Sequence, residues 1–354
     1  MKKKVKNKEK RKMNKKDKRI ITICCIIFVL CIAGIIGYYL MLSTPEPKKA
    51  AKKETSQLKI VDQNSNQRPI AVMIDNNVGN NAHEGLQDSY INYEIIVEGG
   101  LTRIMALYKD KDVAKIGPVR SSRHYFLDFS SESDAIYAHY GWSTYAEKDI
   151  KALGINNVNG LTSDSAYWRD KTIKAPHNVF TSTEKIYETA KKMNYKTTTK
   201  DWKLLNYSVK EITFKDPADG EEDNRLLANS VSLKYSNYQT VSYTYDSENK
   251  YYLRSMNGKP HTDKSTDQQL HYKNIIVEQV FNKLLDNDGR QDLETEGNGS
   301  GYYITNGYAL PIKWEKDTRT SKTKYTYEDG TEVKVNDGNT FIQILPATQI
   351  PEIN

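Results

Sequence analysis

The chain has 354 residues, of which 27% are charged, and its formal net charge at pH 7 is +7. The positive charge lies at the N-terminus: residues 1–19 contain 12 Lys or Arg and 2 Asp or Glu and carry +10, which leaves residues 20–354 with −3. A nucleic-acid-binding domain carries a basic excess on its folded part. The sequence therefore predicts no nucleic-acid partner.

Residues 20–42 form an uncharged apolar run directly after this basic tail. The run is long enough to cross a hydrocarbon core of about 30 Å. Basic residues before it, and Tyr38 and Tyr39 near its far end, predict a cytoplasmic N-terminus. A cleaved signal peptide is the alternative, but its apolar core is usually about 7–15 residues long. We expect a single-pass cell-membrane anchor that contacts the lipid bilayer through residues 20–42, with residues 1–19 cytoplasmic and the folded domains extracytoplasmic.

All three cysteines, Cys24, Cys25 and Cys31, lie in the apolar run, so the exported part cannot form an internal disulfide. None of them follows the small residue that a bacterial lipobox requires. Residues 43–67 contain Lys, Ser and Pro with little periodicity, which predicts a flexible spacer. The remaining length of about 285 residues is typical of two domains.

Strands and helices alternate over residues 68–200. The predicted elements are strands at 70–74, 91–98, 102–108 and 134–140, and helices at 120–130, 144–153 and 181–193. Such alternation indicates a mixed α/β layer domain. From residue 201 onward Tyr becomes abundant, and short alternating runs between turn residues predict a mainly β domain at 201–354. The expected fold class is α+β or mixed α/β, with an N-terminal α/β domain and a mainly β C-terminal domain after one transmembrane helix.

We predict that the functional site lies within residues 91–123. Glu94 and Glu98 are four residues apart and share one face, about 13 Å apart on a strand. We favour a strand because β-branched residues alternate with polar ones, and Gly99-Gly100 then fits a hairpin turn that requires positive φ. On the returning strand Arg103 is the single charge among apolar neighbours, and Glu98 is its nearest candidate partner. Both glutamates are candidate catalytic residues.

Arg120, Ser121 and Arg123 are candidate binding residues at the start of the predicted helix 120–130, just after Pro118. Arg120 and Arg123 would be neighbours on the first turn, where the helix dipole disfavours cations. An anion at this position, such as a carboxylate, a phosphate or the two glutamates, would explain them. The alternative is a pair of surface arginines with no shared ligand.

Asp75, His139 and His177 complete the titratable candidates. Asp75 follows a buried apolar strand, where α/β sheets gather ligands, although turn chemistry explains an Asp there equally well. The two histidines lack a partner at metal-ligand spacing, and the chain has neither an HExxH motif nor a Cys pair of zinc type. We therefore predict no metal and no cofactor, and expect a hydrogen-bonding role for each histidine.

Several segments resemble the YerB family of bacterial cell-surface lipoproteins. The matching runs are residues 68–76, 93–108, 116–126, 175–183, 301–314 and 338–346. The resemblance covers nearly all of residues 68–346 and implies a two-domain exported protein tethered to the outer face of a Gram-positive cytoplasmic membrane. This chain departs from the family pattern because it keeps a spanning helix without a lipobox. The family is described chiefly by domains of unknown function, so the resemblance implies a location more than a chemistry.

Three functional hypotheses follow from these residues. The first is a cell-envelope protein that binds a peptidoglycan-type glycan or anionic wall polymer, with Trp142 or Trp168 stacking on sugar rings. In its enzymatic form, this hypothesis adds cleavage of the polymer with a glutamate as general acid. The second is a non-catalytic scaffold for other envelope proteins, in which the same charges form a buried network. The third and weakest is a metal-dependent hydrolase that uses Asp75, His139 and His177. The clustering of the glutamates and arginines favours the first.

Overall fold

The structure is a computed structural model that describes residues 14–43, 57–77, 82–214 and 224–354, and the chain divides into two units, residues 1–55 and 56–354. The first unit contains helix α1 (Lys15–Ser43), which is long and apolar enough over Lys15–Tyr39 to cross a membrane. The expected N-terminal apolar helix is therefore present. Residues 1–13 of the predicted cytoplasmic tail and residues 44–56 of the predicted spacer lie outside the described residues.

Residues 57–67 belong to the folded unit rather than to the spacer that we expected. Leu58 and Val61 are buried, and the Asp337 carboxylate accepts hydrogen bonds from the backbone amides of Lys59 and Ile60 at 2.8 and 3.1 Å. The spacer prediction was too long because two apolar residues in a polar segment give no readable periodicity. Asp337, which binds this segment, lies near the other end of the chain.

One large sheet organises the folded unit. Among the described residues it has 11 strands, and the main path runs β22 (Lys324–Thr326), β21 (Tyr308–Lys316), β20 (Gly297–Thr305), β17 (Asn274–Val280), β24 (Thr340–Pro346), β2 (Ile91–Ile96), β3 (Thr102–Tyr108), β1 (Ile70–Asp75), β4 (Ile136–His139) and β5 (Asn157–Asn159), with β9 (Leu226–Leu227) beside β21. Strand β24 pairs in parallel with β17 on one side and with β2 on the other. The N-terminal and C-terminal halves of the chain thus share one sheet.

A second sheet is built from the C-terminal half. It contains β13 (Lys259–Pro260), β12 (Tyr251–Met256), β11 (Thr240–Asp246), β10 (Ser230–Lys234) and β25 (Glu352–Ile353), with β16 (His271–Tyr272) beside β12. Smaller pairs are β14 (Thr262–Asp263) with β15 (Gln268–Gln269), β18 (Asn282–Leu284) with β19 (Gln291–Leu293), β23 (Lys334–Asn336) with β8 (Asn206–Ser208), and β6 (Trp168–Arg169) with β7 (Val179–Phe180). These strands confirm a β-rich C-terminal half.

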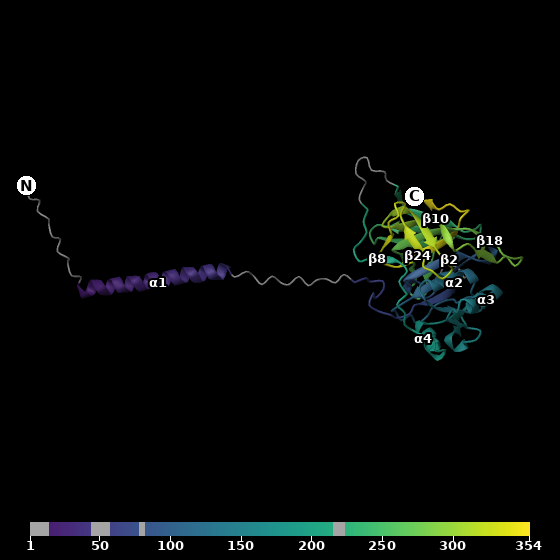
Figure 1. Ribbon diagram of the computed structural model, residues 1–354, viewed down its shortest axis with the longest axis horizontal. Helices are drawn as coiled ribbons and strands as arrows, with labels where there is room; N and C mark the ends of the chain where they lie inside the picture. The colour runs from purple at the N-terminus through teal and green to yellow at the C-terminus, as the bar shows by residue number, and fades with distance from the viewer. Residues whose placement is uncertain (1–13, 44–56, 78–81, 215–223) are drawn as a thin grey trace, which may run out of the picture. The chain divides into compact units, whose positions relative to one another are not determined.

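The helices of the folded unit come from the N-terminal half and lie together on one side of it (Figure 1). They are α2 (His124–Ser131), α3 (Thr144–Ala152) and α4 (Thr183–Lys192), with single 3₁₀ turns η1 (Leu86–Asp88), η2 (Glu98–Gly100) and η3 (Asp164–Ala166). Helices α3 and α4 begin after Ser143 and Ser182, whose hydroxyls accept from the backbone amides of Ala146 and Lys185, both at 3.2 Å. This mixture of helices and sheet confirms the expected mixed α/β class.

Helix α2 begins at His124, four residues later than predicted. Residues 119 and 120 are instead held against strand β1: Val119 bridges Ile74, and the Arg120 amide donates to the Met73 carbonyl at 3.0 Å. Arg120 and Arg123 are therefore not on one helical turn, as we had expected. Pro118 predicted a helix start, but the residues after it stay extended because they pair with strand β1.

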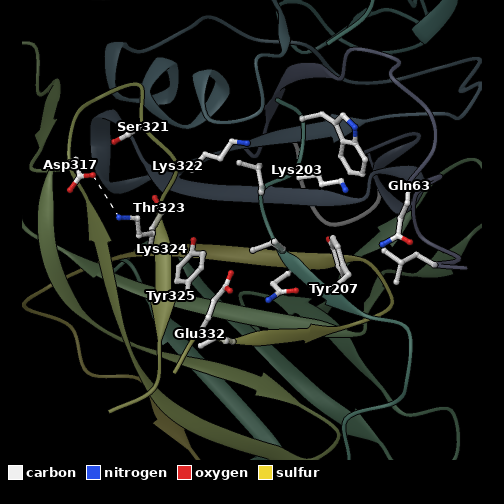
Figure 2. Close-up of a pocket in the computed structure, with 16 residues that line it drawn as sticks. Gln63, Lys203, Tyr207, Asp317, Ser321, Lys322, Thr323, Lys324, Tyr325 and Glu332 are labelled. Atoms are coloured by element: carbon white, nitrogen blue, oxygen red, sulfur yellow. Dashed lines mark ion pairs between the residues drawn. The ribbon is translucent and has the colours of Figure 1, made fainter. Parts of the chain in front are cut away.

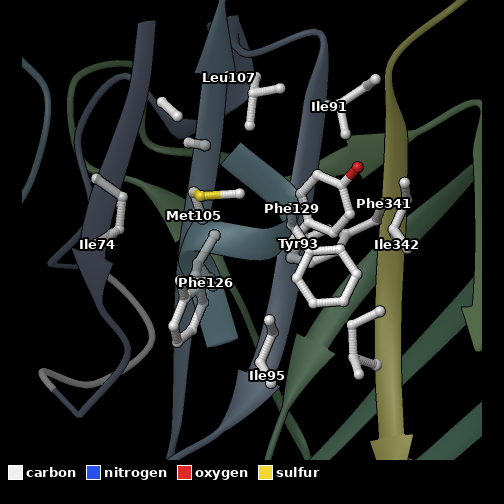
Figure 3. Close-up of a cluster of buried hydrophobic side chains, with 14 of the residues drawn as sticks. Ile74, Ile91, Tyr93, Ile95, Met105, Leu107, Phe126, Phe129, Phe341 and Ile342 are labelled. Carbon is white, nitrogen blue, oxygen red and sulfur yellow. The ribbon is translucent and has the colours of Figure 1, made fainter. Parts of the chain in front are cut away.

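Helix α2 packs its aromatic face on the shared sheet. Figure 3 shows Phe126 and Phe129 against Tyr93 and Met105, and the ring centroids of Tyr93 and Phe129 are 5.0 Å apart. Phe341 of strand β24 belongs to the same buried cluster. Since residues from both halves of the chain fill this core, each half helps to bury the other. Separate unfolding of 68–200 and 201–354 stays a prediction for limited proteolysis.

Candidate functional site

The predicted hairpin is present and carries the two glutamates. Strands β2 and β3 pair antiparallel, with Ile96 opposite Thr102, and Gly99 and Gly100 have φ angles of 70° and 72°. A Cβ on Gly100 would lie 2.9 Å from the Ser236 hydroxyl, so the turn also needs glycine for close packing. Glu98 lies in the turn η2, beyond the end of the strand, so Glu94 and Glu98 do not share a strand face as expected.

Glu94 is completely buried and fully hydrogen-bonded. Its Oε1 accepts from Asn76 Nδ2 at 2.9 Å and from the Thr102 hydroxyl at 2.7 Å, and its Oε2 accepts from Arg254 Nη2 at 2.8 Å. Both side chains of the Glu94–Arg254 pair have 0% exposure. Burial acts against the charge of Arg254, but Glu94 outweighs it and holds the Arg254 pKa above its ordinary value. Glu94 does not face an open cleft, and this geometry favours a structural role.

A chain of buried polar contacts continues from Arg254 to Asp75. Arg254 Nε donates to His261 Nδ1 at 3.0 Å, His261 Nε2 lies 2.8 Å from His83 Nδ1, and His83 Nε2 lies 2.6 Å from the Asp75 carbonyl oxygen. Because an arginine can only donate, each neutral histidine donates from Nε2, and the direction of the whole chain is set. Burial lowers the pKa of His83 to about 4 and that of His261 well below its usual range, in agreement with neutral rings.

Asp75 lies at the surface end of this chain, at the last residue of strand β1. Its Oδ2 is 2.6 Å from His177 Nδ1 and 2.9 Å from Arg120 Nε. The Asp75 side chain is 3% exposed, whereas those of Arg120 and His177 are 26% and 29% exposed. Its Oδ1 accepts from the Asn77 amide at 3.0 Å, so Asp75 also makes the turn contact that we considered as the alternative.

Glu98 pairs with Arg123 and not with Arg103, which corrects our expectation. Arg123 Nε contacts Glu98 Oε1, and Arg123 Nη2 donates to Glu98 Oε2 at 3.0 Å, which makes a bidentate pair. Burial acts to raise the pKa of Glu98, but the hydrogen bonds and charge of Arg123 hold it below its ordinary value. Alternation along the strand could not identify this partner, because Arg123 belongs to the segment ahead of α2.

Arg103 has no carboxylate partner in the described part of the chain; its Nη1 donates to the Ser121 carbonyl at 2.6 Å. The pKa of Arg103 is lowered to about 10, chiefly by burial and then by the positive charge of Arg123, while Glu98 acts to raise it. The structure therefore brings Arg103, Arg120 and Arg123 close to Ser121. Arg103 comes from strand β3, and Arg120 and Arg123 come from the extended segment before α2 rather than from its first turn.

Comparison with known proteins identifies the family. The sequence matches the family described as "Protein of unknown function (DUF3048)", its N-terminal domain over residues 55–196 and its C-terminal domain over residues 231–342. The chain belongs to the DUF3048 family. A YerB relative and a YerB crystal structure confirm the resemblance seen in the sequence.

This DUF3048 chain is similar to a curated relative and to a solved structure. It is 28% identical over 331 residues to "Putative lipoprotein YerB" of Bacillus subtilis (strain 168), covering 93% of this chain and 96% of the relative. It also matches the crystal structure of the YerB protein from Bacillus subtilis, with a TM-score of 0.69 and 29% identity over 81% of this chain and 94% of that chain. Helix α1 together with a relative described as a lipoprotein indicates a membrane-associated, extracytoplasmic protein.

The remaining predicted residues of the DUF3048 chain have structural contacts. His139 is fully buried, with Nδ1 2.7 Å from the Gly141 carbonyl oxygen and Nε2 3.1 Å from Asn157 Oδ1, and burial lowers its pKa to about 4. Trp142 is partly exposed, with its ring centroid 5.6 Å from that of His139. The ring centroid of Trp168 is 6.5 Å from that of Phe180. Within the described ranges, no three His, Cys, Asp or Glu side chains form a group that could hold a metal ion.

Sequence analysis of this DUF3048 protein missed Arg254, His83 and His261. Each lies far along the chain from a partner: 160 residues separate Arg254 from Glu94, and 178 separate His261 from His83. The sequence did contain one indication of Arg254. It lies two residues after Tyr252 on strand β12, so the two side chains share the inward-facing side of the strand. An arginine at such a position requires a buried acceptor.

Proposed function

We propose that the protein is a membrane-tethered extracytoplasmic binding module that holds an anionic group of an envelope polymer. The binding surface is the arginine cluster, which we define as Arg103, Arg120 and Arg123. One observation carries the proposal: among the described residues, these three guanidiniums and the nearby His177 pair with two carboxylates, Asp75 and Glu98, and Arg103 pairs with neither.

Arg103 is the residue of the arginine cluster that most needs an anion. Its side chain is buried, its pKa is lowered first by burial and then by Arg123 and Arg120, and its one described hydrogen bond goes to a backbone carbonyl. A guanidinium is a planar fork that binds a carboxylate or a phosphate through two parallel hydrogen bonds. An anionic ligand beside Arg103 would relieve the repulsion among the three cations.

Apolar side chains next to the arginine cluster suit a sugar backbone. The backbone of Trp142 bridges Ser122, and the Trp142 ring is partly exposed. Leu161 is 62% exposed, and both Leu161 and Ser121 lie within 4 Å of the position that a Cβ on Gly141 would occupy. Flat apolar groups beside hydrogen-bonding cations are typical of sites that bind acidic saccharides.

Binding without bond cleavage is the form of the hypothesis that the geometry supports best. A general acid must reach the leaving group with a transferable proton. Glu94 is shielded from solvent and held by Arg254, and both oxygens of Glu98 are engaged by Arg123. Release of muropeptides from purified peptidoglycan by the wild-type protein would restore the enzymatic hypothesis.

The test is sedimentation of the full-length protein in detergent with purified cell walls, either intact or stripped of their anionic polymers. We expect binding to intact walls alone, weakened by salt. Arg103→Gln removes a charge but keeps a donor for the Ser121 carbonyl, and should weaken binding about 10-fold, or ~1.4 kcal/mol. Lys151→Gln, at an exposed position on α3, removes the same charge elsewhere and should have no effect. Equal binding by Arg103→Gln, or to stripped walls, would refute the proposal.

A further inference from the structure

A cavity of about 590 Å³ lies in the folded unit, away from the residues assigned above (Figure 2). Three separate stretches of chain line it, at 58–63, 202–207 and 317–333. None of its lining residues belongs to the arginine cluster or to the chain of contacts from Glu94 to Asp75. The volume falls in the range of about 300–1,000 Å³ that is usual for small-molecule sites.

Three lysines and two carboxylates, those of Asp317 and Glu332, line this cavity, and the net excess of one positive charge favours an anion. Of its three lysines, Lys324 is 3.8 Å from the Asp317 carboxylate. Lys203 and Lys322 have no carboxylate partner in the part of the chain that the structure describes, and Lys203 lies 5.7 Å from the Trp202 ring centroid. Figure 2 shows Lys203 and Lys322 on one side of the cavity, with Tyr207 and Tyr325 on the other. Two ammonium groups are therefore available to a ligand.

The walls of the cavity are held in place from beneath. The Tyr325 hydroxyl donates to the carboxyl group of the buried Glu278, and the Thr323 hydroxyl donates to Glu132 at 2.8 Å. The buried Lys316 ammonium contacts Glu132 and donates to the Ser321 carbonyl at 2.7 Å. The stretch 321–325, which carries Lys322, is thus anchored at both ends by hydrogen bonds to core residues. A site fixed in this way loses little conformational entropy on binding.

The remaining lining contains aliphatic, polar and aromatic side chains. Of its aliphatic members, Leu58, Leu205 and Val333 are buried and Leu204 is partly exposed. Tyr207, which is partly exposed, and Asn206, which is exposed, line the same space. An aromatic face stacks on a sugar ring, and amides bond to its hydroxyl groups.

We propose that this cavity binds an acidic sugar, meaning a saccharide ring that carries a phosphate or a carboxylate group. Lys203 and Lys322 hold the acidic group, and the ring lies against Tyr207. The site is independent of the arginine cluster, because the two surfaces share no residue and are tested by different variants.

Calorimetric titration of the full-length protein in detergent tests this site with four probes: glucose 1-phosphate, glucuronate, glucose and inorganic phosphate. We expect binding of one or both acidic sugars, with glucose and inorganic phosphate at least about 10-fold weaker because each lacks half of the recognised chemistry. Binding of glucose 1-phosphate alone assigns the phosphate source, and binding of glucuronate alone assigns the carboxylate source. Equal affinity for glucose or for inorganic phosphate, or no binding of either acidic sugar, overturns the proposal.

Variants separate this site from the proposed wall-binding function. Lys322→Gln should weaken binding of the acidic sugar about 10-fold, and Lys322→Arg should restore most of it because the charge returns. Arg103→Gln should bind the sugar as the wild type does, whatever its effect on wall sedimentation. Unchanged binding by Lys322→Gln, or lost binding by Arg103→Gln, would contradict a separate site at this cavity.

Discussion

Glu94 and Glu98 are four residues apart on one hairpin, yet the structure gives them opposite surroundings. The Glu94 side chain is 0% exposed and pairs with Arg254 from the C-terminal half, whereas the Glu98 side chain is 23% exposed and pairs with Arg123, 25 residues further along the chain. Both oxygens of Glu94 accept hydrogen bonds from core residues, while Glu98 lies beside the arginine cluster, in which Arg103 has no carboxylate partner among the described residues. Burial and partner, rather than residue type, separate a structural carboxylate from one at a binding surface.

The difference between these two ion pairs should appear first in stability. Breaking a buried pair leaves an uncompensated charge in the core and costs about 3–5 kcal/mol, whereas a surface pair contributes about 0–1 kcal/mol. All four tryptophans lie between residues 142 and 314, so their fluorescence reports the folded unit and not the membrane helix. Urea unfolding, monitored by tryptophan fluorescence, is the measurement that checks each of the stability predictions.

Replacing Arg254 should have the largest effect. Arg254→Met fills similar space but leaves Glu94 charged, buried and without a cation, so the free energy of unfolding should fall by about 3–5 kcal/mol. The matched variant Arg290→Met breaks a partly exposed pair with Asp286 and should leave the free energy of unfolding nearly unchanged. A loss below 1 kcal/mol for Arg254→Met would mean that the Glu94 pair does not support the core.

A double-mutant cycle sharpens this result. Glu94→Gln and Arg254→Met each leave one charged residue buried without its partner, but the double variant removes both charges of this pair. We expect the double variant to lose less stability than the sum of the single losses, by about 1–3 kcal/mol. Strict additivity in urea unfolding would show that the two residues act independently.

Glu278 provides a third carboxyl group, which is buried and has no ion pair with the other described residues. Burial raises its pKa to about 8, so the folded protein keeps this proton while the unfolded chain loses it near pH 4.3. Stability from this group is therefore full below about pH 4 and is lost as the pH rises toward 8. Glu278→Gln should remove a decline of up to about 1.4 kcal/mol per pH unit across this window.

The measurement for Glu278 is urea unfolding of wild type and variant at steps between pH 5 and 8. Asp128, whose pKa burial raises to about 6, is unchanged in both proteins, so its contribution of the same sign cancels in the difference. Parallel curves for wild type and Glu278→Gln would mean that Glu278 is ionised in the folded protein.

Glu98→Gln should have the smallest effect on stability. The pair with Arg123 is partly exposed, so we expect a loss of at most about 1 kcal/mol at pH 7. Because the pKa of Glu98 is lowered on folding, this contribution is present above the unfolded pKa of about 4.3 and is lost as the pH falls through the folded value. Wild type and variant should therefore converge in acid. A loss as large as that of Arg254→Met would remove the distinction between the two glutamates.

Local pattern was sufficient for much of the fold. Alternation and glycine chemistry predicted the hairpin of β2 and β3, the strand that ends at Asp75 and the β-rich C-terminal half. Helix α4 begins at Thr183, two residues after the predicted start at Thr181, because Thr181 and Ser182 are equally suitable N-caps by residue type. These features depend on neighbours in sequence, which a sequence displays directly.

The partners across long separations could not be predicted in this way. Strand β24 inserts beside β2, and Arg254 reaches Glu94, only because the two halves share one sheet and one core. Arg120 was expected on a helix, but its backbone pairs with strand β1 instead. The candidate arginines were therefore found by residue type and grouping, while their carboxylate partners required the tertiary structure.

Nuclear magnetic resonance of arginine side chains tests the contrast between the two regions most directly. The Nε signals of Arg103, Arg123 and Arg254 would be assigned in the full-length protein in detergent and followed as soluble anionic wall polymer is added. We predict that the signals of Arg103 and Arg123 shift with saturation while that of Arg254 stays fixed, since Arg254 is buried against Glu94. A shift at Arg254 with none at Arg103 and Arg123, or no shift at any of them, would contradict the account.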